Sequence, residues 1–298
     1  MNQIVFNNSS LTIKNNNLVN FGITFFLLFF SVNGSFAQES ITIQGKIENK
    51  DGVAIPFCSV IIKEKQKGVY SDLEGKFEIK ANKEYSLVFS HLSHSNKTVA
   101  INDLIQNQNL IIQLNPLSFP IPAVDIVPKK MKLVKFKNSK RSHYSFGPSR
   151  GYTVAYHLTD HVGGLLQEVT FYLRKPNAKS NVFAGIRIFR KDDKMSNENN
   201  LYIKNDVRQI RKRKLKVDFS DDHIEIPPEG LLVGLEYISF SSLNSDTNIG
   251  RLKIYYTNIF NKFKTYVSTW GNDWRLDQEV HLNKVQNMKI SYKVLVEE

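Results

Sequence analysis

The ten residues Ser71–Lys80, SDLEGKFEIK, join a turn to a half-buried strand and decide the fold class. Asp and Gly supply turn chemistry in DLEG, and KFEIK then alternates apolar with polar residues, as a strand with one buried face does. The same alternation occurs in ITIQGKIE, Ile41–Glu48, and in NLIIQL, Asn109–Leu114. We therefore predict a small antiparallel β-sandwich over residues 38–115.

Period-two alternation resumes after Gly151, and helical periodicity is nearly absent from the whole chain. Several strands separated by turn signals predict a second, larger β-sandwich over residues 151–298, most plausibly a jelly roll, in an all-β protein. The segments that carry this second pattern are VTFYL (169–173), GIRIF (185–189), LLVGLEYI (231–238), RLKIYY (251–256) and MKISYKVLV (288–296).

The N-terminal segment predicts export. FGITFFLLFFSV, Phe21–Val32, is apolar but too short to cross about 30 Å of hydrocarbon comfortably. Ser35 and Ala37 then place small residues at the two positions that a signal peptidase reads. We expect residues 1–37 to be a signal peptide and the protein to reach the periplasm, the outer membrane or the cell surface. An uncleaved anchor is the alternative, because the long lead-in carries only Lys14.

A proline-rich and then basic stretch separates the two predicted sandwiches. Four prolines between 116 and 128 cannot donate to a β-ladder and predict a stiff, extended connector. From Lys129 to Arg150 the chain has eight basic residues and no acidic one. We interpret residues 116–150 as a linker, either a solvated tether or an electrostatic contact to an anionic surface. The cations proposed for that contact are Lys135, Lys137, Lys140 and Arg141.

Charge and cysteine content limit the partners. The 298-residue chain has a formal net charge of +12, which favours anionic neighbours such as a membrane surface or an acidic glycan. Nucleic acid is not predicted, because the chain is expected to be exported. Cys58 is the single cysteine, so no internal disulfide can form and ordinary cores must hold the protein together.

Two histidines, His91 and His94 in FSHLSHSNKT, raise the question of a metal site. Residues three apart on an extended strand face opposite sides and stand about 10 Å apart. Two nitrogens that bind one ion must each lie about 2 Å from it. We therefore predict no metal here; only a sharp turn after His91 would bring the rings together. His157 and His161 are separated by a turn as well and lack the glutamate of a zincin.

No pattern for catalysis is visible. No histidine is followed by glutamate at the three-residue spacing of a zinc carboxypeptidase, and no GxSxG elbow or phosphate-cradling glycine loop occurs. Cys58 lies in the apolar strand PFCSVII, which is typical of a buried thiol, and Asp221–Asp222 read as a turn. We predict a protein that is not an enzyme and that has no cofactor.

The segment STWGNDWRLDQ, Ser268–Gln278, is the best candidate ligand surface. Two flat rings, an amide and a carboxylate suit the rim of a sugar site, because aromatic faces stack on pyranose rings. The alternative is a hairpin turn whose tryptophans fold back over the core. The residues concerned are Trp270, Asn272, Asp273 and Trp274.

Several motifs together resemble the carboxypeptidase regulatory-like domain, a transthyretin-like sandwich common in envelope proteins of Bacteroidota. They are GKI from Gly45, DGVAIP at Asp51–Pro56, SDLEGKF at Ser71–Phe77 and LVFS at Leu87–Ser90. That family usually has an aromatic–x–Gly–aromatic pattern at the position of His91 and His94, so the resemblance implies that the histidines replace rings. It names no ligand. The second half is similar, more loosely, to uncharacterised domains that often follow this module.

From the sequence we predict a non-catalytic, exported envelope protein that acts as a binding or structural module for a protein or a glycan. One alternative is an accessory of a TonB-dependent outer-membrane transport system, because the regulatory-like domain often precedes such barrels. Another alternative is an unrecognised hydrolase whose site is assembled from distant residues.

Overall fold

The structure is a computed structural model and describes one compact unit within Ser40–Glu298. Strands dominate it, and the short helix α2, Ile101–Leu104, is the only α-helix among the described residues. No helix in this part of the chain is long and apolar enough to span a bilayer. The described residues are 40–105, 110–117, 130–138, 144–148, 150–177, 181–191, 199–202, 204, 206–239, 251–258, 264–270, 273–276 and 286–298.

The N-terminal half is the predicted small sandwich. In one sheet β1 lies between β4, which is antiparallel to it, and β7, which is parallel to it. The second sheet has the order β3-β2-β5-β6. Ile43 and Ile47 of β1 point inward and pack with Phe77 and Phe89, as the alternation predicts. The strands are β1 (Ser40–Glu48), β2 (Ser59–Ile62), β3 (Lys67–Tyr70), β4 (Lys76–Asn82), β5 (Ser86–His91), β6 (His94–Ala100) and β7 (Ile111–Gln113).

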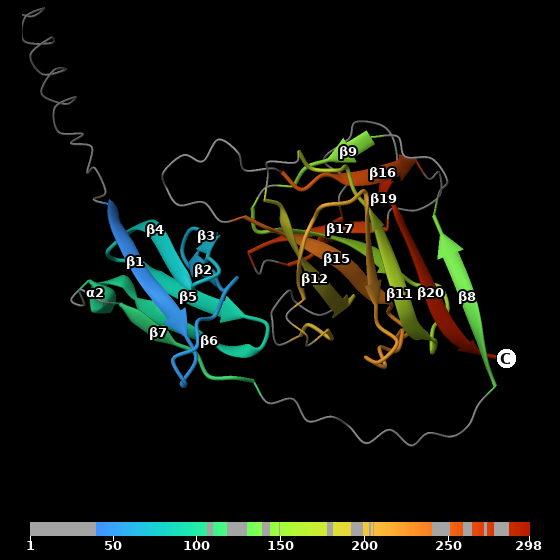
Figure 1. Ribbon diagram of the computed structural model, residues 1–298, viewed down its shortest axis with the longest axis horizontal. Helices are drawn as coiled ribbons and strands as arrows, with labels where there is room; N and C mark the ends of the chain where they lie inside the picture. Colours follow the sequence, from blue (N-terminus) through green and yellow to red (C-terminus); the bar gives the residue numbers. More distant parts are fainter. Residues whose placement is uncertain are drawn as a thin grey trace, which may run out of the picture. The chain divides into compact units, whose positions relative to one another are not determined.

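The C-terminal half is a larger sandwich with jelly-roll order, so the predicted fold class is confirmed. One sheet runs β14-β11-β20-β8 and the other β13-β12-β15-β10-β17-β18. Figure 1 shows β11, β20 and β8 of the first sheet side by side. The chain changes sheet between β10 and β11 and again between β11 and β12, and it comes back to the four-stranded sheet at β14 and at β20. A small third sheet has the order β19-β16-β9. The strands are β8 (Met131–Lys137), β9 (Tyr144–Phe146), β10 (Tyr152–Leu158), β11 (Leu165–Tyr172), β12 (Phe183–Arg190), β13 (Val207–Gln209), β14 (Lys214–Asp218), β15 (Leu231–Ile238), β16 (Ile254–Asn258), β17 (Thr265–Thr269), β18 (Arg275–Leu276), β19 (Gln286–Met288) and β20 (Ile290–Glu297).

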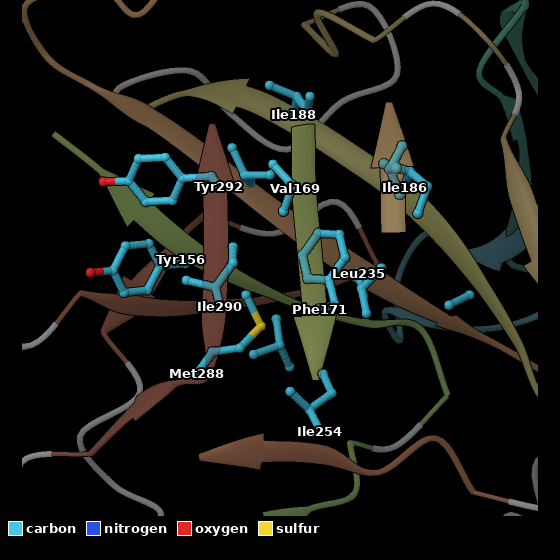
Figure 2. Packing of buried hydrophobic residues seen from close by; sticks show 14 of the residues in the cluster. Tyr156, Val169, Phe171, Ile186, Ile188, Leu235, Ile254, Met288, Ile290 and Tyr292 are labelled. Atoms are coloured by element: carbon cyan, nitrogen blue, oxygen red, sulfur yellow. The ribbon is translucent and has the colours of Figure 1, made fainter. Parts of the chain in front are cut away.

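The core of this second sandwich lies between its sheets. Figure 2 shows Val169 and Phe171 of β11 beside Ile290 of β20, close to Leu235 of β15. These four side chains are fully buried. Because alternate residues of each strand point inward, the intervening residues of β11 and β20 form an outer face on the four-stranded sheet.

The basic segment around residue 135 is a strand rather than a tether. Residues Met131–Lys137 form β8, which pairs antiparallel with β20 along its whole length. Phe136 points inward and stacks on Tyr292, with ring centroids 4.7 Å apart. The predicted linker of residues 116–150 is therefore wrong over β8, which is the first strand of the jelly roll. The lysines mask a period-two pattern, because they occupy the solvent face of a half-buried strand.

Buried side chains join the two sandwiches. The Tyr70 hydroxyl donates a hydrogen bond to Glu236 of β15, and Glu236 forms an ion pair with Arg187 of β12. The side chains of this ion pair are only 7% and 8% exposed. The guanidinium lies directly above Gly185, where a Cβ atom would come within 2.8 Å of it. Glycine at this position thus lets a buried arginine reach its carboxylate.

Candidate anion-binding site

Three lysines converge on one tyrosine at the end of β11. Lys214 lies opposite Tyr172 across the β11–β14 pair, and Lys137 ends β8 opposite Ser291. The ammonium groups of Lys137, Lys214 and Lys289 lie 5.6, 5.8 and 4.9 Å from the centroid of the Tyr172 ring. The Tyr172 hydroxyl is 3.2 Å from that of Ser291, which fixes the ring on the outer face of the sheet. Each cation is within the range of a cation–π contact.

Two of these three lysines have no carboxylate partner among the described residues. Within the part of the chain that the structure describes, neither Lys137 nor Lys214 forms an ion pair, and both are exposed. Lys289 is only 5% exposed. Its burial lowers its pKa, and the neighbouring charges of Lys137 and Lys214 lower the pKa further. A bound anion would relieve this repulsion.

An open pocket of about 570 Å³ is also basic, and its Arg213 is the sequence neighbour of Lys214. Its lining residues are Ser145, Arg174, Lys175, Arg213 and Tyr255. Backbone hydrogen bonds connect the two clusters: Leu173 N–H donates to the Arg213 carbonyl, and Lys289 N–H donates to the Tyr255 carbonyl. We call the combined surface the basic end. Its cations are Lys137, Arg174, Lys175, Arg213, Lys214 and Lys289.

The chemistry of the basic end is that of recognition. Guanidinium groups present planar forks that match carboxylate, sulfate or phosphate oxygens, and ammonium groups add point charges. Ser145 and Tyr255 contribute hydroxyls, and the Tyr255 ring offers an apolar face. The five lining residues include no carboxylate, histidine or cysteine that could act as a nucleophile or general base. The arrangement therefore fits the binding of an anionic ligand.

The other end of the same sheet face is neutralised. Glu168 accepts hydrogen bonds from Lys216 at 2.8 Å and from Lys293 at 2.7 Å. Burial alone would raise the pKa of Glu168, but the two lysines outweigh burial and lower it. Lys216 and Lys293 thus have an internal partner, whereas Lys137 and Lys214 beside Tyr172 are exposed and have no carboxylate partner among the described residues.

The cations predicted for surface contact have different fates. Lys137 belongs to the basic end. Lys135 is exposed on the same face of β8 and lies opposite Lys293 of β20. Lys140 and Arg141 lie outside the described residues. Lys137 is thus a candidate anion contact in both the sequence and the structure, although the sequence placed it on a linker.

The tryptophans of the predicted sugar rim pack against their own chain. Trp270 stacks on Tyr70 with ring centroids 5.1 Å apart. It also covers Gly151, where a Cβ atom would lie 2.1 Å from its ring, so only glycine fits there. Trp274 meets Phe189 edge-on at 5.6 Å. Asp273 is exposed, and Asn272 lies outside the described residues.

The His91–His94 pair corrects the geometry expected from the sequence. Leu92 and Ser93 form a two-residue turn, so the histidines face each other as the last pair of the β5–β6 hairpin. Their Nδ1 atoms are 3.0 Å apart rather than about 10 Å, because the strand reverses after His91. His91 is only 5% exposed, and burial together with the charges of His94 and Arg187 lowers its pKa to about 3.

The remaining residues considered from the sequence have structural surroundings. The His157 Nε2 atom is 2.8 Å from the Glu229 carbonyl oxygen. His161 has a φ of 67° in the turn that follows β10, away from His157. Cys58 is fully buried, and this burial raises the pKa of its thiol. Such a thiol resists ionisation and is a poor nucleophile.

Sequence inspection missed most of the basic end because its residues come from six separate parts of the chain. Lys212–Lys216, KRKLK, is visible as a charge run, but only its pairing with β11 brings Lys214 to Tyr172. Lys289 is a single lysine in an apolar strand pattern, and nothing local distinguishes it from a surface residue. Long-range strand register creates the cluster.

Comparisons with known proteins match one segment of the chain to a known domain family. Residues 43–124 match the family of the CarboxypepD_reg-like domain, as the motifs suggested, and this domain is non-catalytic. No curated protein matches the chain. BcpA, the major pilin subunit of Bacillus cereus, is similar at 9% identity, covering 87% of this chain and 69% of the pilin, but its TM-score of 0.18 carries no argument. The N-terminal sandwich is thus similar to the carboxypeptidase regulatory-like domain, and this family match does not reach the jelly roll that carries the basic end.

Proposed function

We propose that this protein is a non-catalytic binding module of the cell envelope that recognises an acidic glycan through the basic end. One observation carries the proposal: six cations from distant strands converge beside an open pocket. Five of them are exposed and form no ion pair with any described residue. Repulsion between these like charges raises the free energy of the unbound protein, and a polyanionic ligand would remove this repulsion.

The shape of the basic end favours a glycan over a flat lipid surface. Arg174, Lys175 and Arg213 line a concavity, which can surround a uronate or sulfate group, whereas a membrane contact needs only a broad, flat set of lysines. Tyr255 in the pocket supplies a ring for the apolar face of a sugar. Jelly rolls also occur in lectins, although this is an analogy of fold alone.

A binding assay on the full chain tests the proposal. The probes are polygalacturonate, dextran sulfate and neutral dextran, each immobilised and titrated over a range of salt concentrations. We expect binding to the two acidic polymers only, with affinity that falls as salt rises. Replacing Lys137, Arg213 and Lys214 by glutamine should weaken this binding at least about tenfold, since each contact between a cation and an anion contributes on the order of 1 kcal/mol.

Lys216→Gln with Lys293→Gln is the matched control, because these lysines lie on the same sheet face but have Glu168 as their partner. This variant should bind the acidic polymers almost as well as the unaltered chain. An equal loss of affinity in both variants would mean that binding depends only on the net charge of the protein. Strong binding to neutral dextran would refute recognition of acidic groups. Preference for anionic vesicles over both polymers would assign the site to a membrane surface instead.

A further inference from the structure

The tip of the β5–β6 hairpin gathers three donor atoms around one point. The Nδ1 atoms of His91 and His94 are 3.0 Å apart. The Ser93 hydroxyl oxygen lies 3.2 Å from the first and 3.1 Å from the second. This cluster belongs to the N-terminal sandwich and has no part in the basic end, so it needs an explanation of its own.

Hydrogen bonds orient the nitrogen lone pair of His91 toward His94. The Ser93 backbone N–H donates to His91 Nδ1 at 3.4 Å, which requires Nδ1 to be the unprotonated nitrogen. The ring also forms a hydrogen bond with the Pro56 backbone, which in this tautomer is donated by Nε2–H. A histidine whose far nitrogen donates to a carbonyl and whose near nitrogen is an acceptor has the arrangement typical of metal ligands, and an ion bound here would replace the long Ser93 N–H contact at 3.4 Å.

Two ring nitrogens this close need a positive centre between them. If His94 carries its proton on Nδ1, that proton bridges the rings; otherwise the two lone pairs repel each other. A divalent ion replaces this proton and binds both nitrogens. At metal–nitrogen distances of about 2.0–2.1 Å, a separation of 3.0 Å gives an N–metal–N angle of roughly 95°.

We propose that His91 and His94 form a two-nitrogen clasp for a divalent transition-metal ion, with Cu(II) the preferred occupant. An angle near 90° suits neighbouring positions of a square-planar or tetragonal ion such as Cu(II) or Ni(II) better than the wider angle of tetrahedral zinc. Among the described residues no cluster of three or more histidine, cysteine or acidic side chains could hold a metal. Water and the Ser93 hydroxyl therefore complete the coordination, and half-buried His94 opens the site to solvent.

Titration with Cu(II) tests the clasp on the full chain without an affinity tag, in the presence of glycine to suppress weak surface binding. We expect one tightly bound equivalent whose electron paramagnetic resonance spectrum shows splitting by two imidazole nitrogens. His94→Gln should weaken that equivalent at least about tenfold, in line with the loss of a metal-site contact. His161→Gln with His223→Gln is the control, because these histidines lie elsewhere in the chain, and it should leave the spectrum unchanged.

Circular dichroism checks that the His94→Gln chain is folded, and His94→Asn replaces it if it is not. Equal copper affinity in the unaltered and His94→Gln chains would overturn the proposal. So would a spectrum with splitting from one nitrogen or none. Tighter binding of Zn(II) than of Cu(II) would contradict the geometry on which the choice of metal rests.

Discussion

Trp270 and Tyr172 are both half-buried rings of the jelly-roll half, but their neighbours differ in kind. Trp270 stacks on Tyr70 and covers Gly151, so its apolar faces are occupied by the protein itself. Tyr172 is surrounded by three ammonium groups, two of which are exposed and form no ion pair with the described residues. The ring of Trp270 already has its packing partners within the protein, whereas the lysines around Tyr172 leave positive charge available to a ligand.

The comparison shows that residue type alone does not make a binding surface. Tryptophan is the best side chain for stacking on a sugar, but a tryptophan that already stacks on a tyrosine gains little by changing partner. Lysine is a common surface residue, but lysines held together against their mutual repulsion gain from any anion that arrives. The two regions differ in how much free energy a ligand could gain by binding there, and this does not follow from their residue types alone.

Removal of the Trp270 ring should give the largest effect. We expect Trp270→Ala to lower the free energy of unfolding by about 2–3 kcal/mol, because the ring packs on Tyr70 of the other sandwich. Binding to dextran sulfate should not change in the folded variant. Urea denaturation and the polymer assay measure the two quantities, with Trp270→Phe as a control that preserves ring packing. If Trp270→Ala kept its stability but lost polymer binding, the tryptophans rather than the basic end would form the binding site.

Reversing the charge of the two exposed lysines beside Tyr172 should lower the affinity for the polymer and leave the stability of the fold unchanged or higher. Lys137→Glu with Lys214→Glu should reduce affinity for dextran sulfate by well over about tenfold and flatten the dependence on salt, while the urea midpoint stays the same or rises. Stability is expected to hold because both side chains are exposed and the change removes repulsion from Lys289. Lost stability with retained binding would show that the lysines support the fold.

Loss of the Glu168 carboxylate should make the neutralised end resemble the basic end. Glu168→Gln frees Lys216 and Lys293, so we expect affinity for the acidic polymer to rise about twofold and stability to fall by about 1 kcal/mol. The folded-state pKa of Glu168 is lowered, so its contribution to stability is present above the unfolded pKa and is lost as pH falls through the folded value. Urea midpoints of both chains should therefore converge at acid pH. A difference that persists at low pH would rule out the charge as its cause.

Sequence patterns predicted the fold more fully than the site. Period-two alternation is local, and it identified β1, β4 and β7 of the first sandwich and β11, β12, β15 and β20 of the second. The pattern failed at β8 because lysines on its outer face looked like a tether. The pattern failed again at His91, where a two-residue turn without glycine brought two rings together. The basic end depends on register between strands far apart in sequence, which local patterns do not contain.

Lys289 offers the smallest and most specific test of the comparison. Burial and the nearby lysines lower its pKa in the folded state, so the folded protein releases this proton at a lower pH than the unfolded chain does. The charge therefore destabilises the fold below the folded pKa, and this penalty disappears as pH rises through that value toward about 10.5. We expect Lys289→Met to stabilise the protein by less than about 1 kcal/mol at neutral pH, because replacing a buried charge by an apolar group is often favourable.

The stabilisation by Lys289→Met should shrink as pH rises through the lowered folded-state pKa of Lys289 toward the ordinary value of about 10.5. Lys214→Met is the matched control, since it removes a lysine beside the same ring that is exposed to solvent, and it should give a smaller stabilisation. Thermal unfolding of the three chains across this pH range measures the difference. Stabilisation that did not shrink as pH rose would come from methionine packing. In that case the positive charge around Tyr172 costs the fold nothing, and the main reason to expect an anion there is lost.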